Sequence, residues 1–365
     1  MPELIWKDFI VLDLVDSLQV VLLGFIGGVL SGFIGSGGAF FMTPGMMNLG
    51  VPGVIAVGSN ITHKFGKAMM GSKRHGELGN VDKKLGVFLL LTSFVGIRIA
   101  VWINSYLFHL GESRGEDKAA AANLYISLVF VSILLVVGLT MLRDVMGSSD
   151  DEAGPSRRIT DALAKLRLFP VIHFPVADVK VSLWVVMAVG LATDYLAGTI
   201  GVGGFIGVPA MIYVFGVPTA VAAGTELFLA MFMGAFGALN YVLAGLVDIR
   251  LTMLLYLGSL VGIYIGAYGT KVVKEVLIRL VTAIIILICV FSRAIAVPIY
   301  LRQLGFIGID PIWDGRLNLI SKVFLLAAGL SGVIVILYNV AVAFRRQARI
   351  RRSLAPVVTA AEARQ

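Results

Sequence analysis

The chain carries a similar glycine-rich segment twice, each time inside a long apolar stretch. Gly-Ser-Gly-Gly at residues 35–38 is followed by Pro44, and Gly-Val-Gly-Gly at residues 201–204 is followed by Pro209. A Gly-Val-Pro sequence then follows each segment, and Gly201 lies 166 positions after Gly35. Closely spaced glycines weaken a helix. Each segment therefore predicts a break in otherwise helical structure.

The spacing of 166 positions holds over most of half the chain. It pairs glycine with glycine and proline with proline, and it pairs Val-Asp at 81–82 with Val-Asp at 247–248. The other matched pairs are Gly24/Gly190, Gly32/Gly198, Pro52/Pro218, Gly58/Gly224, Gly71/Gly237, Gly79/Gly245 and Gly96/Gly262. Chance does not preserve a register of that length, so the sequence predicts a duplicated unit.

Composition places the chain in a membrane. Of its 365 residues 58% are hydrophobic and 14% are charged, whereas soluble domains carry about 25% charged residues. Apolar runs long enough to cross a hydrocarbon core of about 30 Å recur at 85–103, 124–142, 181–200, 251–269, 277–297 and 319–344. These features predict an all-α polytopic membrane protein.

Several other classes of protein do not fit the sequence. The net charge of +8 lies in short loops and near the C-terminus, as membrane topology requires, and does not indicate a nucleic-acid partner. The single cysteine, Cys289, excludes a disulfide within the chain, and no ligand set has the spacing of a metal site. No Lys-Ser/Thr follows the glycines, so neither segment is a phosphate-binding P-loop. We expect no cofactor and no enzymatic activity.

Hydropathy and charge divide the chain into four parts. Residues 1–142 form the first transmembrane repeat, and 143–180 form a basic cytoplasmic linker. Residues 181–300 form the second repeat, and 301–365 form a C-terminal transmembrane helix with a basic cytoplasmic tail.

The loops favour an inverted arrangement of the repeats. If the first apolar segment and the short piece 39–49 form a re-entrant hairpin, the basic loops 73–84, 143–180, 271–279 and 345–352 share one face. A full crossing would instead place the arginine-rich C-terminus outside, against the positive-inside rule. The first repeat then has three crossings, so the second is inverted, as in many transporters. We expect a multi-pass inner-membrane protein with a cytoplasmic C-terminus.

The breaks suggest a binding site for an anion. Exposed backbone at membrane depth is tolerated only where it lines a cavity or is buried in protein. A helix N-terminus carries about half a positive charge and offers free N–H groups. Two breaks that face each other would therefore form a pseudo-symmetric anion site. In the alternative interpretation, the glycines only permit a tight turn between packed half-helices; the duplication favours the shared site.

Polar residues inside apolar stretches are costly and mark functional positions. The repeat pairs Asn60 with Glu226, whereas Lys64 and Lys67 correspond to apolar residues. The two lysines share a helix face that would hold an oxyanion. The alternative is an ion pair of a lysine with Glu226 or Asp194, and both can hold. The predicted substrate-binding residues are Gly35, Ser36, Gly37, Gly38, Asn60, Lys64, Lys67, Gly201, Gly203, Gly204, Thr225 and Glu226.

Two further patterns are interpreted as packing. Gly24, Gly28 and Gly32 form a smooth strip that lets another helix approach closely. Asp194 replaces a glycine in the equivalent strip of the second repeat. His63 is expected to be a packed, hydrogen-bonded histidine, although a proton-linked role is compatible with its chemistry.

The repeated glycine motif with its following prolines resembles the sulfite exporter TauE/SafE family. The resemblance covers residues 17–110 and 181–297 and implies a permease with duplicated halves. It implies sulfite, sulfoacetate or a related sulfur-containing or organic anion as substrate. We expect a secondary transporter that works by alternating access, with a proton or sodium as coupling ion. A passive anion channel, an intramembrane enzyme and a structural subunit are the alternatives, and the oligomeric state is left open.

Overall fold

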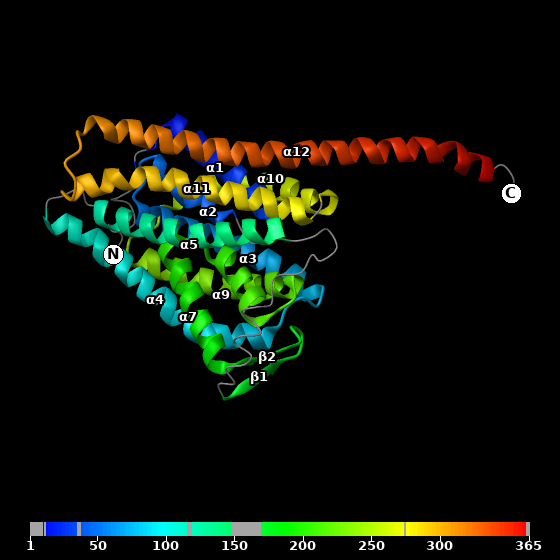
Figure 1. Ribbon diagram of the computed structural model, residues 1–365, viewed down its shortest axis with the longest axis horizontal. Coiled ribbons are helices and arrows are strands. Elements are labelled where there is room, and N and C mark those ends of the chain that lie inside the picture. Colours follow the sequence, from blue (N-terminus) through cyan, green and yellow to red (C-terminus); the bar gives the residue numbers. More distant parts are fainter. Residues whose placement is uncertain are drawn as a thin grey trace.

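The computed structural model is a helical bundle, and it describes residues 10, 12–34, 38–114, 119–147, 169–273 and 275–362. The helices and strands follow in chain order: α1 Leu14–Ile34, α2 Ala39–Asn48, α3 Gly53–Glu77, α4 Lys83–Arg114, α5 Ala120–Gly147, β1 Val171–Phe174, β2 Val179–Ser182, α7 Leu183–Ile200, α8 Gly203–Ala210, the π-helical turn η2 Met211–Phe215, α9 Thr219–Leu243, α10 Ile249–Val272, α11 Glu275–Gln303 and α12 Ile312–Glu362. Figure 1 shows α5, α11 and α12 side by side along one side of the bundle.

Within the described residues, eight helices are long and apolar enough to cross a membrane: α1, α4, α5, α7, α9, α10, α11 and α12. Large apolar side chains are exposed along them, among others Leu91, Trp102, Leu257, Phe291 and Ile334. An exposed apolar surface of this extent needs lipid around it. The predicted class, an all-α polytopic membrane protein, is confirmed. The polar helix α3 is not among these eight.

The glycine strip of α1 packs as the sequence predicts. A Cβ on Gly24 would lie 2.6 Å from Leu255 O, and one on Gly28 would lie 2.5 Å from Ser259 O. Both distances are too short for real atoms, so α1 and the partner helix α10 touch backbone to backbone. In the second half a Cβ on Gly190 of α7 would lie 2.7 Å from Leu89 O of α4. Leu89 and Leu255 are themselves 166 positions apart.

Hydrogen bonds to α3 and α9 also follow the repeat spacing. The Asp248 N–H donates to Ser59 Oγ at 3.1 Å, and the Asp82 N–H donates to Thr225 Oγ1 at 3.0 Å. Both donors and both acceptors are pairs that the 166-residue spacing relates. In both contacts an aspartate N–H of one half thus donates to a hydroxyl oxygen of the other half.

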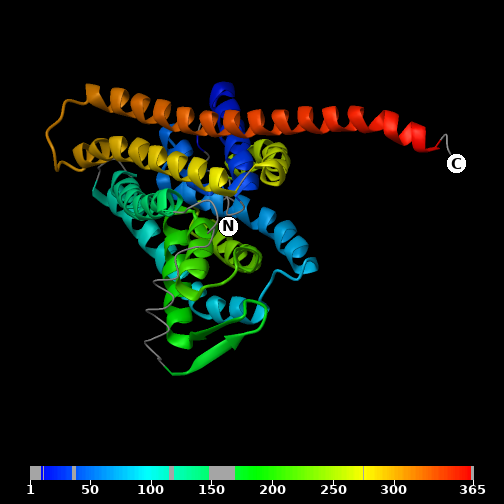
Figure 2. The same cartoon turned by 45° about the vertical axis from the view of Figure 1, so that its right-hand side comes forward.

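Two segments differ from the sequence expectation. The predicted linker 143–180 contains the end of α5 and most of an antiparallel hairpin of β1 and β2, which ends at Ser182, while residues 148–168 lie outside the described part. The last helix was expected near 319–344, but α12 runs from Ile312 to Glu362. Figures 1 and 2 show its C-terminal part projecting well beyond the bundle, where no other described element lies beside it.

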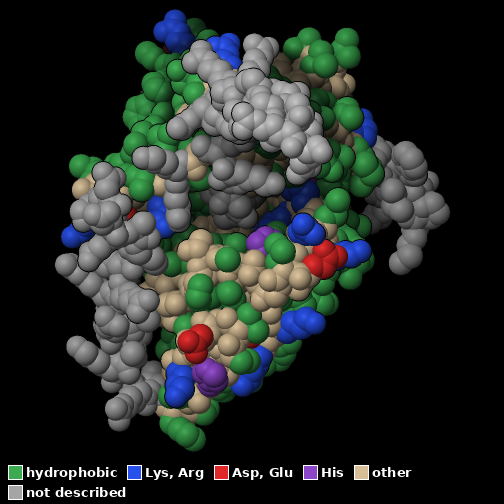
Figure 3. All heavy atoms as spheres, turned by 90° about the vertical axis from the view of Figure 1, so that its right-hand side faces the viewer, with side chains coloured by type: hydrophobic (Ala, Val, Ile, Leu, Met, Phe, Trp, Pro, Cys, Tyr) green, Lys and Arg blue, Asp and Glu red, His purple; other side chains and the backbone are tan. Residues whose placement is uncertain are grey.

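Basic side chains gather at one end of the molecule. Figure 3 views this end, where Lys and Arg outnumber the acidic side chains in sight. Exposed basic residues of the α3–α4 turn and the hairpin there are Lys73, Arg74, Lys83, Lys84 and Lys180. Lys84 Nζ donates to His173 O at 2.8 Å and so ties α4 to the hairpin.

Candidate functional site

The two predicted breaks are present at the expected places. α1 ends at Ile34 and α2 begins at Ala39, while Gly35, Ser36 and Gly37 lie outside the described residues. In the second half α7 ends at Ile200 and α8 begins at Gly203. Gly201 between them has φ +77°, a left-handed conformation that glycine adopts without strain. One helix thus ends before each glycine segment, and the next helix begins at Ala39 or at Gly203.

Gly38 is held against α1. A Cβ on Gly38 would lie 1.9 Å from Gly27 O and 2.6 Å from Gly27 C. No side chain fits at this position, because the obstructing atoms belong to the backbone. Gly38 thus fixes how closely α2 folds back on α1.

Asn60 of α3 brings the two breaks together. Its Nδ2 donates to Ala39 O at 3.1 Å and to Thr43 Oγ1 at 2.9 Å, and it lies 3.5 Å from Gly201 O. The side chain is fully buried, and its Oδ1 has no hydrogen-bond partner among the described residues. The start of α2 and the end of α7 therefore meet at one amide. Phe40 and Phe205 also pack there, with ring centroids 5.0 Å apart.

Lys64 lies at the start of α8 and pairs with Glu226. Its Nζ is 3.5 Å from Glu226 Oε1. A Cβ on Gly203 would lie 2.5 Å from Lys64 Nζ, so the ammonium group is placed at the second break. A Cβ on Gly207 would lie 2.1 Å from Glu226 Oε2, so the carboxylate lies against the same helix. The sequence suggested either an internal ion pair or a lysine placed to bind an anion. Lys64 is compatible with both, because its ion pair with Glu226 lies at the second break.

The remaining predicted residues lie at different distances from the breaks. Lys67 is half-buried one turn beyond Lys64, without a carboxylate at ion-pair distance among the described residues. Gly204 is buried in the first turn of α8. Thr225 instead accepts a hydrogen bond from the α3–α4 turn. The prediction for His63 is confirmed, because the ring is fully buried and its Nε2 lies 2.7 Å from Ser259 Oγ.

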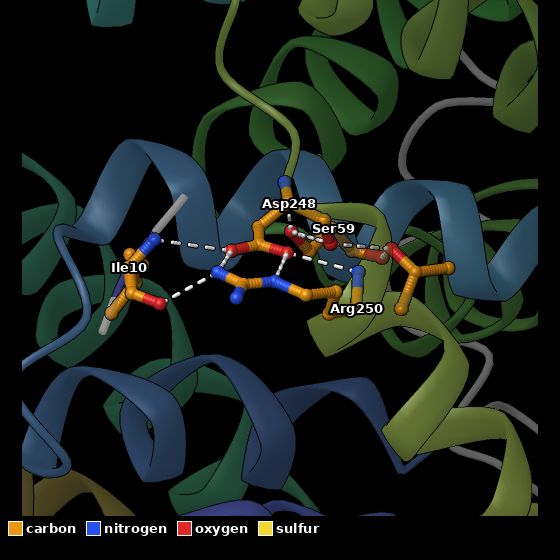
Figure 4. Close-up of polar contacts among 5 residues, drawn as sticks. Ile10, Ser59, Asp248 and Arg250 are labelled. Atoms are coloured by element: carbon orange, nitrogen blue, oxygen red, sulfur yellow. Dashed lines mark hydrogen bonds and ion pairs between the residues drawn. The ribbon is translucent and has the colours of Figure 1, made fainter. Parts of the chain in front are cut away.

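Two buried aspartates make contacts along α3, Asp248 at Ser59 and Asp82 just after the end of the helix, and sequence reasoning noted them only as part of the repeat. Asp248 Oδ2 accepts from the Ile10 N–H at 3.3 Å, and Arg250 Nη2 donates to Ile10 O at 2.6 Å (Figure 4). Asp82 Oδ2 accepts from the N–H groups of Val176 and Ala177, each at 3.0 Å. Asp248 thus bonds the backbone of Ile10, and Asp82 holds the turn of the β1–β2 hairpin.

A second polar cluster was also missed. Arg293 of α11 is buried, donates to Tyr300 OH at 2.7 Å and lies 3.4 Å from Asn48 Oδ1. Ser321 Oγ of α12 lies 3.2 Å from the same Asn48 oxygen. The cluster joins the end of α2 to the two last helices. Asn48 has no polar counterpart in the repeat, since residue 214 is a valine, so no comparison of the halves could have revealed it.

Known proteins resemble the chain over most of its length. The family model "Sulfite exporter TauE/SafE" matches residues 20–293. The chain belongs to this family. Two Bacillus subtilis (strain 168) proteins named "Probable membrane transporter protein" are similar: YjnA is 26% identical over 69% of this chain and 89% of its own. YdhB is 24% identical over 72% of this chain and 94% of its own. No solved structure matches.

The family and the names of these relatives identify the protein as a membrane transporter. The matched region runs from α1 into α11 and includes both glycine breaks, Asn60, Lys64 and Glu226. The helix α12 lies wholly beyond it.

Proposed function

We propose that this TauE/SafE protein is a secondary transporter of a small anion, such as sulfite, sulfoacetate or a related sulfur-containing or organic anion. It moves the anion across the cytoplasmic membrane by alternating access. The observation that carries the proposal is the meeting of the two helix breaks at Asn60, with Lys64 Nζ at the second break.

The chemistry at this place suits an oxyanion. The first turn of α8 directs free N–H groups toward the break, and a helix N-terminus attracts negative charge. Lys64 Nζ lies at the same turn, and Lys67 adds a second cation without an ion-pair partner among the described residues. Charged donors bind oxyanions more strongly than neutral ones do. An anion between α3 and α8 would satisfy these groups together.

An inverted arrangement of the two repeats is supported by the aspartate anchors. Ser59, which contacts Asp248, lies near the start of α3, and Asp82 follows its end. At 1.5 Å per residue, Ser59 and the end of α3 at Glu77 are about 27 Å apart. Lys64 and Lys67 lie between these two positions on α3, so the two aspartate anchors lie on opposite sides of the lysines along the helix, as an inverted arrangement requires. The positive-inside rule places the basic end of Figure 3 in the cytoplasm.

Alternating access requires the site to be closed from each side of the membrane in turn. The contacts of Asp248 and Asp82 are proposed to hold these two sides closed. Ile10 contacts Asp248 on one side of the lysines, and the β1–β2 hairpin contacts Asp82 on the other side. Each contact joins segments that are remote in sequence, so each must break when its own face opens.

The anchors predict opposite effects on access to the centre. With Thr43→Cys as reporter and Cys289→Ser as background, Asp248→Ala should increase labelling by an impermeant thiol reagent from the Asp248 face. Asp82→Ala should increase labelling from the other face. The reporter is fully buried beside Asn60, so labelling requires an open pathway. Labelling from the same face in both variants would contradict the assignment.

The proposed function is tested with purified protein in liposomes. We expect uptake of labelled sulfite, thiosulfate, sulfate or sulfoacetate that is accelerated by the same anion inside the vesicle. A transported anion should also raise the melting temperature, because a ligand that binds the folded state stabilises it. Absence of both effects for every anion tested would reject the proposal.

The same vesicles distinguish a passive channel. Exchange accelerated by anion on the far side requires one site that alternates between faces. Unitary currents in a planar bilayer, far above transporter turnover, would favour a channel instead.

A further inference from the structure

We propose that transport is coupled to protons and that Asp194 of α7 is the carboxyl group that carries the coupling proton. The proposal rests on the anion transport proposed above and names the second ligand of the same site. It is carried by the hydrogen bonds around Ser93 and by the charges around Lys64.

Asp194 occupies a place where the other half of the chain has a glycine. Its counterpart, Gly28, packs against the backbone of Ser259 in α10. The residue that corresponds to Ser259 is Ser93 of α4, and Asp194 is bonded to it. Packing at this crossing therefore does not require a carboxyl group. The carboxyl group is an addition that only the second half carries.

Ser93 can bond Asp194 in either protonation state. Its Oγ lies 2.5 Å from Asp194 Oδ2 and 2.8 Å from Leu89 O. A hydroxyl group has one hydrogen and can donate to only one of them. When the hydrogen points to Asp194, the carboxyl oxygen accepts it, which is compatible with an ionised carboxylate. When it points to Leu89, as serines in helices often bond the residue four before them, the contact with Asp194 is a hydrogen bond only if the carboxyl carries a proton.

Charges from two other helices face Asp194. Lys64 of α3 attracts it, and Glu226 of α9 lies near enough for the two carboxylates to repel each other. α5 contributes Tyr125, which bonds Tyr195 beside Asp194. One lysine thus lies within Coulombic range of two carboxylates.

The charge balance links the proton to the anion. Lys64, Lys67, Asp194 and Glu226 together are neutral when all are ionised. A bound dianion such as sulfate leaves two uncompensated negative charges, and burying such charge is costly. Protonation of Asp194 removes one of them, so the anion and the proton favour each other's binding. By linkage the effect is reciprocal, and the anion should bind more tightly as the pH falls.

The experiment measures anion affinity against pH and accumulation driven by a pH gradient. The probes are sulfate and thiosulfate, whose own charge does not change near neutral pH. For wild-type protein we expect affinity to rise as pH falls and, with the membrane potential clamped at zero, anion to accumulate about tenfold per unit of pH gradient. Asp194→Asn should bind with an affinity independent of pH and should not accumulate anion. Its amide can still bond Ser93, so the variant keeps the local contact.

Ser259→Ala is the matched control, because the equivalent serine contacts His63 instead of Asp194. It should retain accumulation driven by the pH gradient. Loss of accumulation in Ser259→Ala with retention in Asp194→Asn would assign the proton to His63 and overturn the proposal. Wild-type transport without pH dependence would also overturn it. Failure of wild-type protein to bind any anion would instead reject the transport function.

Discussion

Gly38→Ala is expected to destabilise the protein and to abolish transport. The new Cβ would lie 1.9 Å from Gly27 O, 2.6 Å from Gly27 C and 2.8 Å from Gly27 Cα. These atoms cannot rotate away, so α2 must move off α1. Overpacking costs about 1–3 kcal/mol where side chains can adjust, and we expect about 3 kcal/mol or more here. Thermal unfolding of the purified protein measures the loss.

Two other glycines give a graded control. A Cβ on Gly27 would meet mainly the flexible side chain of Met42, so Gly27→Ala should be milder. A Cβ on Gly76 of α3 would have no atom within 4 Å, and alanine is the better helix former by about 1 kcal/mol. Gly76→Ala should therefore not destabilise the protein. Equal melting temperatures for Gly38→Ala and Gly76→Ala would refute the tight contact between α1 and α2.

Lys64→Gln and Lys67→Gln are both expected to remove anion binding, but with different effects on stability. Lys64→Gln leaves Glu226 without its partner. Breaking a fully buried ion pair costs about 3–5 kcal/mol, and the cost here should be smaller because the side chains keep 19% and 11% of their exposure. Lys67 has no ion-pair partner among the described residues, so Lys67→Gln should keep or raise the melting temperature. Anion-induced thermal shifts measure the binding.

A double variant separates the structural role of Lys64 from its binding role. Lys64→Gln combined with Glu226→Gln removes both charges, so stability should recover while anion binding stays lost. Recovery of both would mean that Lys64 serves only to neutralise Glu226. Full anion binding by Lys67→Gln would remove the second cation from the proposed site.

The repeat made much of this architecture accessible from sequence. The spacing of Gly24, Gly28 and Gly32 predicted a close helix contact, since only a residue without a side chain permits one, and α10 makes that contact. The breaks at Gly38 and Gly201 followed from the low helix propensity of glycine. The sequence offered two acidic partners for the lysines, Glu226 and Asp194. Glu226 pairs with Lys64, and Asp194 bonds Ser93.

Features that occur in only one half of the chain could not be predicted from the sequence. The contact of Arg293 with Asn48 joins residues 245 positions apart, and neither local propensity nor the repeat spacing relates them. The β1–β2 hairpin forms within a segment whose composition indicated only a linker, because its turn is fixed by the buried carboxylate of Asp82.

The sequence by itself determined that this protein is a helical membrane protein, and it predicted a duplicated unit, because hydropathy and residue spacing can be read along the chain. Only the tertiary structure decided which groups meet at the breaks. Asn60, Lys64 and Glu226 come together through the packing of α3 against α8 and α9. Such contacts depend on how helices cross in space, and the order of residues along one helix does not specify that crossing.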